Sequence, residues 1–152
     1  MGNHTWGKKE IFNFINDEKI IRPANYPAGV PGEGYRIQEC NGKKIAVINL
    51  LGRVNVTVLT ENPFLKADEI LDKIKNKADI IIVDFHAEAT AEKIAMGYYL
   101  DGRVTCVFGT HTHIQTADEQ ILEKGTGYIT DIGMTGPKKS VIGMEVATSI
   151  KR

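Results

Sequence analysis

The chain has few cysteines and no excess of charge of either sign. Its 152 residues include two cysteines, Cys40 and Cys106, which lie far apart and outside any CxxC pattern. This excludes a disulfide-rich secreted scaffold and indicates free thiols in a reducing compartment. Lysine plus arginine and aspartate plus glutamate number 19 each, and the basic residues are scattered, so no basic stripe for binding nucleic acid is present. A small phosphorylated substrate remains compatible with this balance, because a metal ion can supply positive charge.

Long apolar runs are also missing. The longest are far shorter than the ~20 residues that a membrane-spanning helix needs, and the N-terminus has no basic-then-apolar signal pattern. With 42% apolar and 25% charged residues, the composition is that of an ordinary soluble globular protein. We therefore expect a single cytoplasmic domain over residues 1–152, with no membrane partner.

Apolar segments alternate with amphipathic ones along the chain. Strands are expected at 45–51, 78–85, 104–108 and 127–130, and helices at 8–16, 62–77 and 91–100. In the last helix, Thr90 is expected to be the cap, with Ile94, Ala95 and Tyr98 on the inner face. The alternation of strands and helices predicts an α/β fold.

The four histidines, His4, His86, His111 and His113, all occur in short polar motifs. His86 directly follows the strand at 78–85, and the His111/His113 pair follows the next one. Ligands of α/β sheets gather at the carboxyl ends of strands, so we expect these imidazoles at one edge. Residues two apart in extended backbone point to the same side, which lets this pair reach one metal ion or two neighbouring ones. The alternative is a polar loop whose histidines only form hydrogen bonds.

Other polar residues in these motifs are candidates for supporting roles. Asn3 offers a hard oxygen that suits Mn or Fe, and His4 is a candidate general acid. The same pair also fits a helix cap beside a surface histidine. Asp84 and Glu88 flank His86, and each is a candidate to orient its imidazole or an ordinary loop carboxylate.

Five segments together resemble the YmdB-like metallophosphoesterases of bacteria. They are 2–6 (GNHTW), 22–25 (RPAN), 84–88 (DFHAE), 109–118 (GTHTHIQTAD) and 131–136 (DIGMTG), and the similarity runs along essentially the whole chain. The resemblance implies an α/β, calcineurin-like sandwich with layers in the order αββα, and a homo-oligomer. For Asp131, which opens the last segment, a structural role is expected.

The resemblance also implies a function. It implies hydrolysis of phosphodiesters such as cyclic nucleotides at two Fe or Mn ions, with Asn3, His86, His111 and His113 as metal ligands. His4 would be the general acid or would stabilise charge in the transition state. Family members also carry a Gly-Asp-Val-Val-Gly segment and an Asn-Gly-Glu-Asn segment that supply further ligands. This sequence contains neither, so we expect an incomplete sandwich, truncated at both ends and lacking the family's N-terminal strands.

Three functions therefore stay open. The first is the two-metal phosphodiesterase, in which the ions activate a water molecule. The second is a truncated, catalytically inactive relative that acts as a metal-binding or subunit-interaction module. The third is a mononuclear zinc hydrolase that uses the three later histidines and an open position. The number of bound metal ions separates these functions. Two ions per chain would favour the phosphodiesterase, one ion would favour the zinc hydrolase, and no bound ion would favour the inactive relative.

Overall fold

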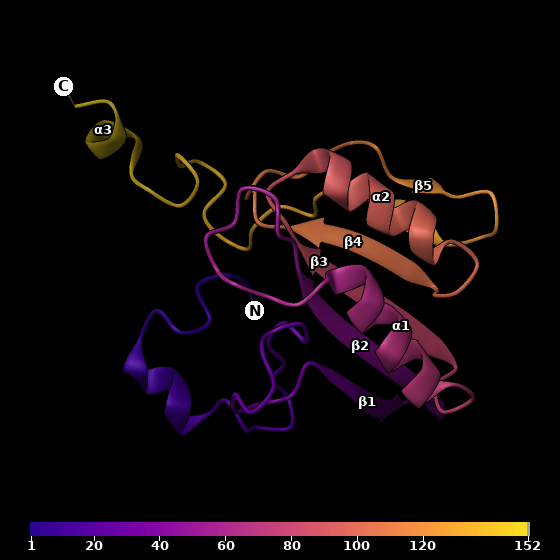
Figure 1. Ribbon diagram of the computed structural model, residues 1–152. Coiled ribbons are helices and arrows are strands. Elements are labelled where there is room, and N and C mark those ends of the chain that lie inside the picture. Colours follow the sequence, from indigo (N-terminus) through magenta and orange to yellow (C-terminus); the bar gives the residue numbers. More distant parts are fainter. Residues whose placement is uncertain (152) are drawn as a thin grey trace.

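A six-stranded sheet forms the centre of the computed structural model, which describes residues 1–151 (Figure 1). The strands are β1 (Tyr35–Cys40), β2 (Lys43–Leu51), β3 (Ile80–His86), β4 (Cys106–Thr110), β5 (Gln120–Ile121) and β6 (Gly127–Ile129). Their order is β1-β2-β3-β4-β6-β5, with a parallel centre and one antiparallel strand at each edge. The helices are the 3-10 helix η1 (Lys9–Asn13), α1 (Pro63–Ile74), α2 (Thr90–Leu100) and α3 (Val146–Ser149).

Helices α1 and α2 cover the same face of this sheet (Figure 1). Alternate side chains of β2 and β3 point into this layer and pack against both helices. The core between the sheet and the helices includes Ile48 and Leu50 of β2, Val83 and Phe85 of β3, Ile70 and Ile74 of α1, and Met96 and Leu100 of α2. Each such side chain contributes roughly 1.5–3 kcal/mol when it is removed from water. Within residues 1–151 the chain therefore forms one sheet and one helical layer of the expected four-layer sandwich.

The four expected strands correspond to β2, β3, β4 and β6, and the α/β prediction is confirmed. Strand β1 was not predicted, because its side chains are half-buried or exposed and give little alternation of apolar and polar residues. The helix expected at 8–16 is a five-residue 3-10 helix, and the helix expected at 62–77 ends at Ile74.

The inner face of α2 differs from the expected one. Ile94, Ala95 and Tyr98 were expected to face the core, but all three are exposed. The buried positions include Lys93 and Met96 instead. Apolar periodicity assigns a lysine to the surface, whereas this lysine is buried because its charge is paired with Asp131.

The two longer helices begin in different ways. At α1 the Asn62 side chain accepts a hydrogen bond from the Phe64 N–H at 2.9 Å, and Pro63 occupies the first turn. At α2 the expected cap is wrong: Thr90 is already helical, and the N-cap is Ala89, which has no side chain to make the bond. In the described part of the chain, no helix is long and apolar enough to cross a membrane.

Two buried polar side chains, Arg22 and Asn25, hold the proline-rich segment between η1 and β1. The Arg22 guanidinium donates hydrogen bonds to three backbone carbonyls of this segment. The Asn25 amide donates to the carbonyls of Leu51 (2.8 Å) and Glu61 (3.0 Å), and its oxygen accepts from the Leu51 N–H (2.8 Å). Asn25 therefore ties the segment to the carboxyl end of β2.

We expect Asn25→Ala to lower the free energy of unfolding by about 3 kcal/mol, because it leaves buried backbone groups without partners. Urea denaturation measures the change. Asn13→Ala, at an exposed position of η1, is the matched control and is expected to stay within roughly 0.5 kcal/mol of the wild type. Equal stability of the two variants would contradict the role of Asn25.

Candidate metal centre

The adjacent parallel strands β3 and β4 end at the same edge of the sheet. His86 is the last residue of β3 and is paired with Thr110, the last residue of β4. The next residue, His111, places its imidazole 4.8 Å from that of His86, measured between ring centroids, at an interplanar angle of 84°. The expected convergence of two strand ends is therefore confirmed for these two histidines.

The N-terminal segment reaches the same place by packing a glycine on the His86 ring. A Cβ atom on Gly2 would lie 2.2 Å from His86 Nε2, so only glycine fits without displacement. The Gly2 carbonyl accepts hydrogen bonds from the Thr5 N–H (3.1 Å), the Thr5 hydroxyl (2.6 Å) and the Tyr26 hydroxyl (3.3 Å). These contacts hold Asn3 Oδ1 at 3.0 Å from His86 Nε2.

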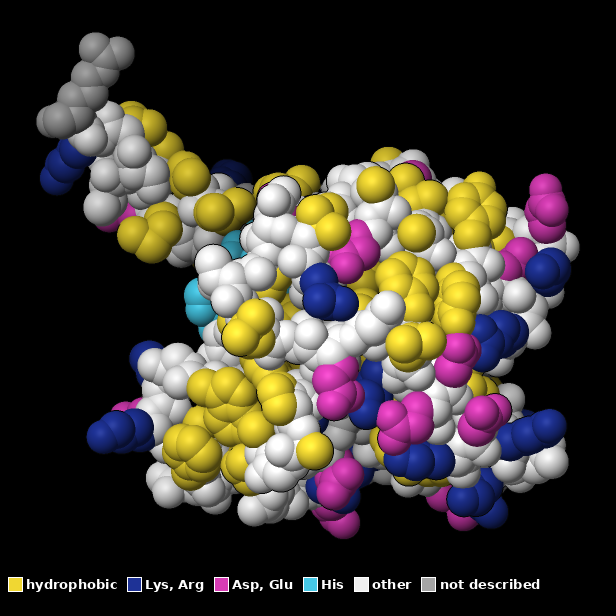
Figure 2. Space-filling view, viewed as in Figure 1, with side chains coloured by type: hydrophobic (Ala, Val, Ile, Leu, Met, Phe, Trp, Pro, Cys, Tyr) yellow, Lys and Arg dark blue, Asp and Glu magenta, His cyan; other side chains and the backbone are white. Residues whose placement is uncertain are grey.

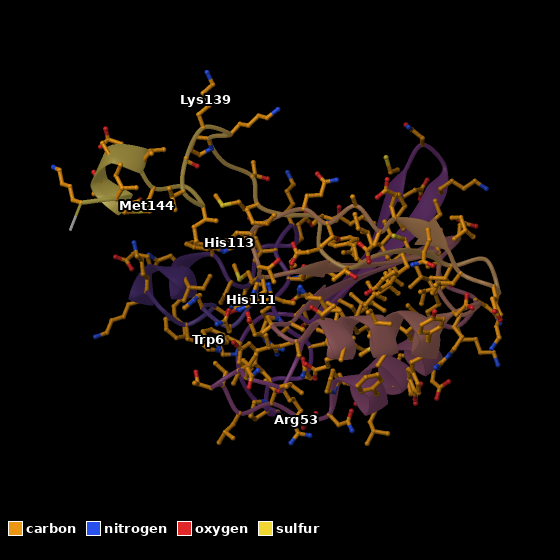
Figure 3. The ribbon with its side chains drawn as sticks, turned by 90° about the horizontal axis from the view of Figure 1, so that it is seen from above. Trp6, Arg53, His111, His113, Lys139 and Met144 are labelled. Atoms are coloured by element: carbon orange, nitrogen blue, oxygen red, sulfur yellow. The ribbon has the colours of Figure 1, made fainter. Side chains whose placement is uncertain are left out.

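A cavity of about 440 Å³ opens over this group of side chains. It is lined by Gly2, Asn3, His4, His86, Glu88, His111, Thr112, His113 and Ile142, which include all five residues predicted for the site. Figure 2 shows the histidines at the edge of the molecule, between its N-terminal part and the C-terminal segment, and Figure 3 labels His111 and His113. Their assignment as ligands and acid stays a prediction.

The donor atoms that meet in this cavity suit a divalent transition metal. His86 Nε2 lies 3.0 Å from both Asn3 Oδ1 and His111 Nδ1, so one oxygen and two imidazole nitrogens converge. His113 lines the cavity without a side-chain hydrogen bond to the other candidates in residues 1–151. In the same range no three His, Cys, Asp or Glu side chains form a metal-holding group, so the cluster depends on the Asn3 amide.

Electrostatics keep the His86 imidazole neutral. Burial, reinforced by the neighbouring His111, lowers the pKa of His86 to about 4. The neutral ring is the form that ligates metals. The residues present therefore fit a metal ion at this position.

The two carboxylates that flank His86 in sequence have different partners. Asp84 Oδ1 accepts from the Thr110 hydroxyl (2.7 Å), which lies 2.9 Å from His86 Nδ1. Glu88 Oε2 lies 2.9 Å from His111 Nε2. The expectation that either carboxylate orients His86 is thus refined: Asp84 acts through a hydroxyl, and Glu88 contacts the other histidine.

The loop after β4 holds both of its histidines in a strained backbone conformation. His111 has φ +110° and His113 has φ +69°, a region that costs about 1–3 kcal/mol for a residue with a side chain. Thr112, between them, donates from its N–H (3.1 Å) and hydroxyl (2.7 Å) to Asp131 Oδ2. The same oxygen accepts from Lys93 Nζ at 2.7 Å, and both charged side chains are 1% exposed.

Burial would raise the pKa of Asp131, but hydrogen bonds from Lys93 and Thr112 outweigh it and hold this pKa below its usual range. The structural role expected for Asp131 is therefore confirmed. Lys93 was missed, because nothing in its local sequence marks it for burial. In the structure it passes close to Gly109, where a Cβ would lie 2.8 Å from Lys93 Cδ and 1.8 Å from the Thr130 carbonyl oxygen.

We expect Lys93→Met to lower the free energy of unfolding by about 3–5 kcal/mol, because it leaves the Asp131 carboxylate buried without its cation. Lys73→Met is the matched control, since Lys73 pairs with Glu69 on the exposed surface of α1. That variant is expected to cost about 0–1 kcal/mol. Chemical denaturation of both variants is the measurement, and similar losses would refute the buried pair.

We expect Gly2→Ala to weaken Mn binding at least ~10-fold, because the added methyl displaces His86 or the Asn3 segment. Calorimetric titration of the protein with Mn measures the change. Gly127→Ala is the control, because a Cβ there meets its neighbours at 3.6–3.9 Å, which is ordinary contact. Unchanged affinity in Gly2→Ala would show that this close packing does not set the site.

Known proteins match the chain over its whole length. A family model described as YmdB-like protein matches residues 1–152. The 2',3'-cyclic-nucleotide 2'-phosphodiesterase of Bacillus subtilis (strain 168) is 57% identical over 153 residues, which cover 100% of this chain and 58% of that protein. A crystal structure described as a novel phosphatase from Mycoplasma pneumoniae superposes with a TM-score of 0.86 at 44% identity, covering 98% of this chain and 55% of that one.

The chain thus spans little more than half the length of these relatives. A more distant structure, the NAD nucleotidase of Haemophilus influenzae, shares the fold, with a TM-score of 0.57 at 18% identity over 84% of this chain and 32% of that one. The expected calcineurin-like fold class is therefore confirmed. From its match over residues 1–152 and its close relatives, this chain belongs to the YmdB-like family.

Proposed function

We propose that this chain supplies part of a metal-dependent phosphodiesterase centre that hydrolyses small phosphodiesters such as 2',3'-cyclic nucleotides. The observation that carries the proposal is the convergence of Asn3 Oδ1, His86 Nε2 and His111 Nδ1 at the carboxyl ends of β3 and β4. The substrate class is supported by the name of the Bacillus subtilis relative, which matches the whole of this chain.

Asn3, His86, His111 and His113 would hold metal, which in a two-metal centre is Fe or Mn. Such ions, when bound, lower the pKa of water and offset charge on the phosphoryl oxygens. The chain's own contribution is to fix the ligands beforehand. Thr112 and its bonds to Asp131 hold the two loop histidines in place, so little ordering remains to be done when substrate binds.

His4 has the properties of a general acid at this site. Its side chain is exposed in the cavity and makes no hydrogen bond to other groups among residues 1–151, so it is free to turn toward a substrate. We propose that it donates a proton to the departing oxygen, a contribution worth about 10²–10⁴ in rate.

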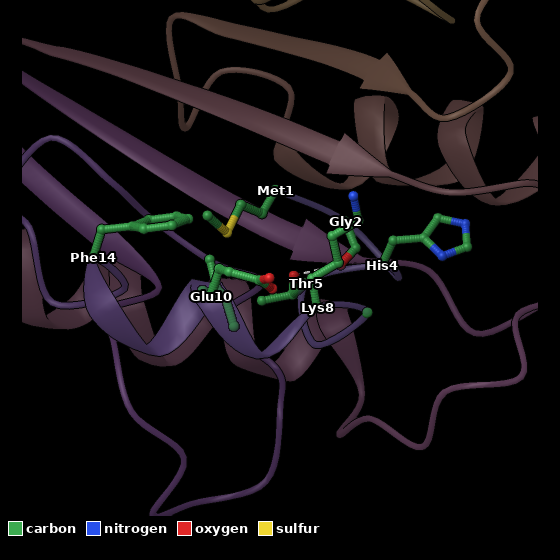
Figure 4. A pocket seen from close by; sticks show the side chains of 9 residues that line it. Met1, Gly2, His4, Thr5, Lys8, Glu10 and Phe14 are labelled. Atoms are coloured by element: carbon green, nitrogen blue, oxygen red, sulfur yellow. Dashed lines mark hydrogen bonds between the residues drawn. The ribbon is translucent and has the colours of Figure 1, made fainter.

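A second cavity, of about 650 Å³, supports a nucleotide as substrate. It shares Gly2 and His4 with the metal cavity and extends between Met1 and Phe14 (Figure 4). Its apolar lining, which includes Ile11, suits a flat base more than a second phosphate. The phosphodiester would then lie at His4, between the two cavities.

A second candidate function is a metal-binding or subunit-interaction module without catalysis. It is favoured by the dependence of the described ligand cluster on a single amide oxygen in addition to histidines.

Homo-oligomer formation is a further proposal, supported by exposed apolar side chains on the C-terminal segment, including Val141, Met144 and Ile150 (Figure 2). The free thiols Cys40 and Cys106 support a cytoplasmic location.

We expect the protein to hydrolyse 2',3'-cyclic AMP when Mn is added, with His111→Ala abolishing metal-dependent turnover because a ligand is lost. His4→Ala is expected to lower kcat by about 10²–10⁴ while Mn still binds. Tyr98→Ala, on the outer face of α2, is the control and should leave the rate unchanged. Mn binding without turnover in the wild type would favour the non-catalytic module.

Metal content measured on the same samples separates the remaining alternatives. Two ions per chain are expected for the dinuclear phosphodiesterase, whereas one zinc ion would favour a mononuclear hydrolase.

A further inference from the structure

A tight turn of the C-terminal segment brings one side chain to the metal cavity. The Val141 N–H donates to the Met144 carbonyl and the Met144 N–H to the Val141 carbonyl, both at 2.9 Å. The two residues between them, Ile142 and Gly143, have φ values of +41° and +96°. Positive φ at both central residues is the signature of a type I′ turn. Ile142 is the residue of this turn that lines the cavity of about 440 Å³.

Isoleucine is an unfavourable residue at this position of the turn. The first central residue of a type I′ turn is usually Asn, Asp or Gly, because these residues tolerate positive φ. Ile142 is branched at Cβ, and a branched residue in this region is an outlier. Burial does not offset the strain, since Ile142 is 52% exposed. Backbone strain of this kind clusters at active sites and ligand clamps, so the residue points to a contact with a ligand.

The turn is held against the loop that carries the later histidines. The Met134 N–H donates to the His113 carbonyl at 3.2 Å, so the C-terminal segment starts beside this loop. A Cβ on Gly143 would lie 3.2 Å from Met134 Cε, which means that the turn packs on the Met134 side chain. The Gly143 N–H also donates to Ser140 Oγ at 3.0 Å. These contacts fix the place of Ile142 beside the cavity.

Ile142 gives an apolar wall to a cavity that is otherwise polar. Among residues 1–151, the other side chains that line it are three histidines and a fourth at His4's neighbour strands, together with an amide, a carboxylate and a hydroxyl. Polar groups suit a phosphate and its metal, whereas a branched alkyl group suits carbon. In a 2',3'-cyclic nucleotide the ribose is fused to the phosphate ring, so sugar carbons enter the cavity with the phosphate.

We propose that Ile142 is a specificity-determining residue that packs on the carbon face of the substrate ribose. The proposal rests on the proposed phosphodiesterase function and adds the part of the substrate that the metal cavity selects. The base would occupy the second cavity near Phe14, and the phosphodiester would lie at His4. The ribose between them would then be held by Ile142, so segments from both ends of the chain grip one substrate.

The test compares Ile142→Asn, which gives the turn its preferred Asn-Gly pair and removes the apolar contact, with Ile142→Val, which keeps it. Ile142→Asn should raise KM for 2',3'-cyclic AMP about 10-fold. The loss should fall on KM and not on kcat, because the ribose is held equally in the ground and transition states. Ile142→Val should recover most of the affinity. Val141→Thr, in the same turn but outside the cavity lining, is the control and should match the wild type.

Three further readouts on the same samples do not depend on turnover. Affinity for adenosine 3'-monophosphate should fall about 10-fold in Ile142→Asn. Affinity for Mn should stay at the wild-type value, and the urea midpoint should rise because the strain is relieved. Ile142→Gly, which also accepts positive φ, is a second variant with the same expected losses of nucleotide affinity.

The outcomes separate this inference from the proposed function. Unchanged KM and nucleotide affinity in Ile142→Asn and Ile142→Gly would overturn the role of Ile142 and leave the phosphodiesterase standing. Weaker Mn binding or a lower urea midpoint in both variants would indicate a structural role and would also overturn it. Nucleotide binding that depends on Ile142, without turnover in the wild type, would support the inference and overturn the proposed catalysis. A wild type that neither binds nor hydrolyses the nucleotide would overturn both.

Discussion

The arrangement of the site depends on the buried ion pair between Lys93 and Asp131. It joins α2 to the loop after β4, because the Asp131 oxygen that pairs with Lys93 also binds Thr112. Removing two such charges from water costs several kcal/mol per ion, and the surrounding hydrogen bonds offset this cost. What the molecule gains is a loop that holds His111 and His113 at positive φ, which neither would adopt alone.

Two separate networks therefore hold the side chains that are proposed as metal ligands. One runs from Lys93 through Asp131 to Thr112 and fixes where the loop histidines lie. The other runs from Asp84 through the Thr110 hydroxyl to His86 Nδ1 and helps to orient this imidazole. The first network acts on the loop after β4, and the second acts on the end of β3. The proposed phosphodiesterase centre would benefit from such preorganisation, because its groups would already be in place when charge develops on the phosphoryl oxygens.

Much of the fold and the site follows from local pattern. Apolar runs mark β2, β3, β4 and β6, and polar motifs at strand ends mark the histidines, because parallel strands bring their carboxyl ends together. The same reasoning failed on α2, where it assigned Ile94 and Tyr98 to the core. A rule based on hydrophobicity cannot anticipate a buried Lys93, since the residue that neutralises it lies 38 positions away in the sequence.

The sequence by itself determined the α/β class, the strand ends that carry His86 and His111, and the membership of a family. These depend on residue type and short spacing, which are local properties. Only the tertiary structure decided that Gly2 packs on the His86 ring, that Glu88 contacts His111, and that Asp84 reaches His86 through Thr110. Each of these depends on distances between segments far apart in the chain, and such distances are set when the sheet and its loops assemble.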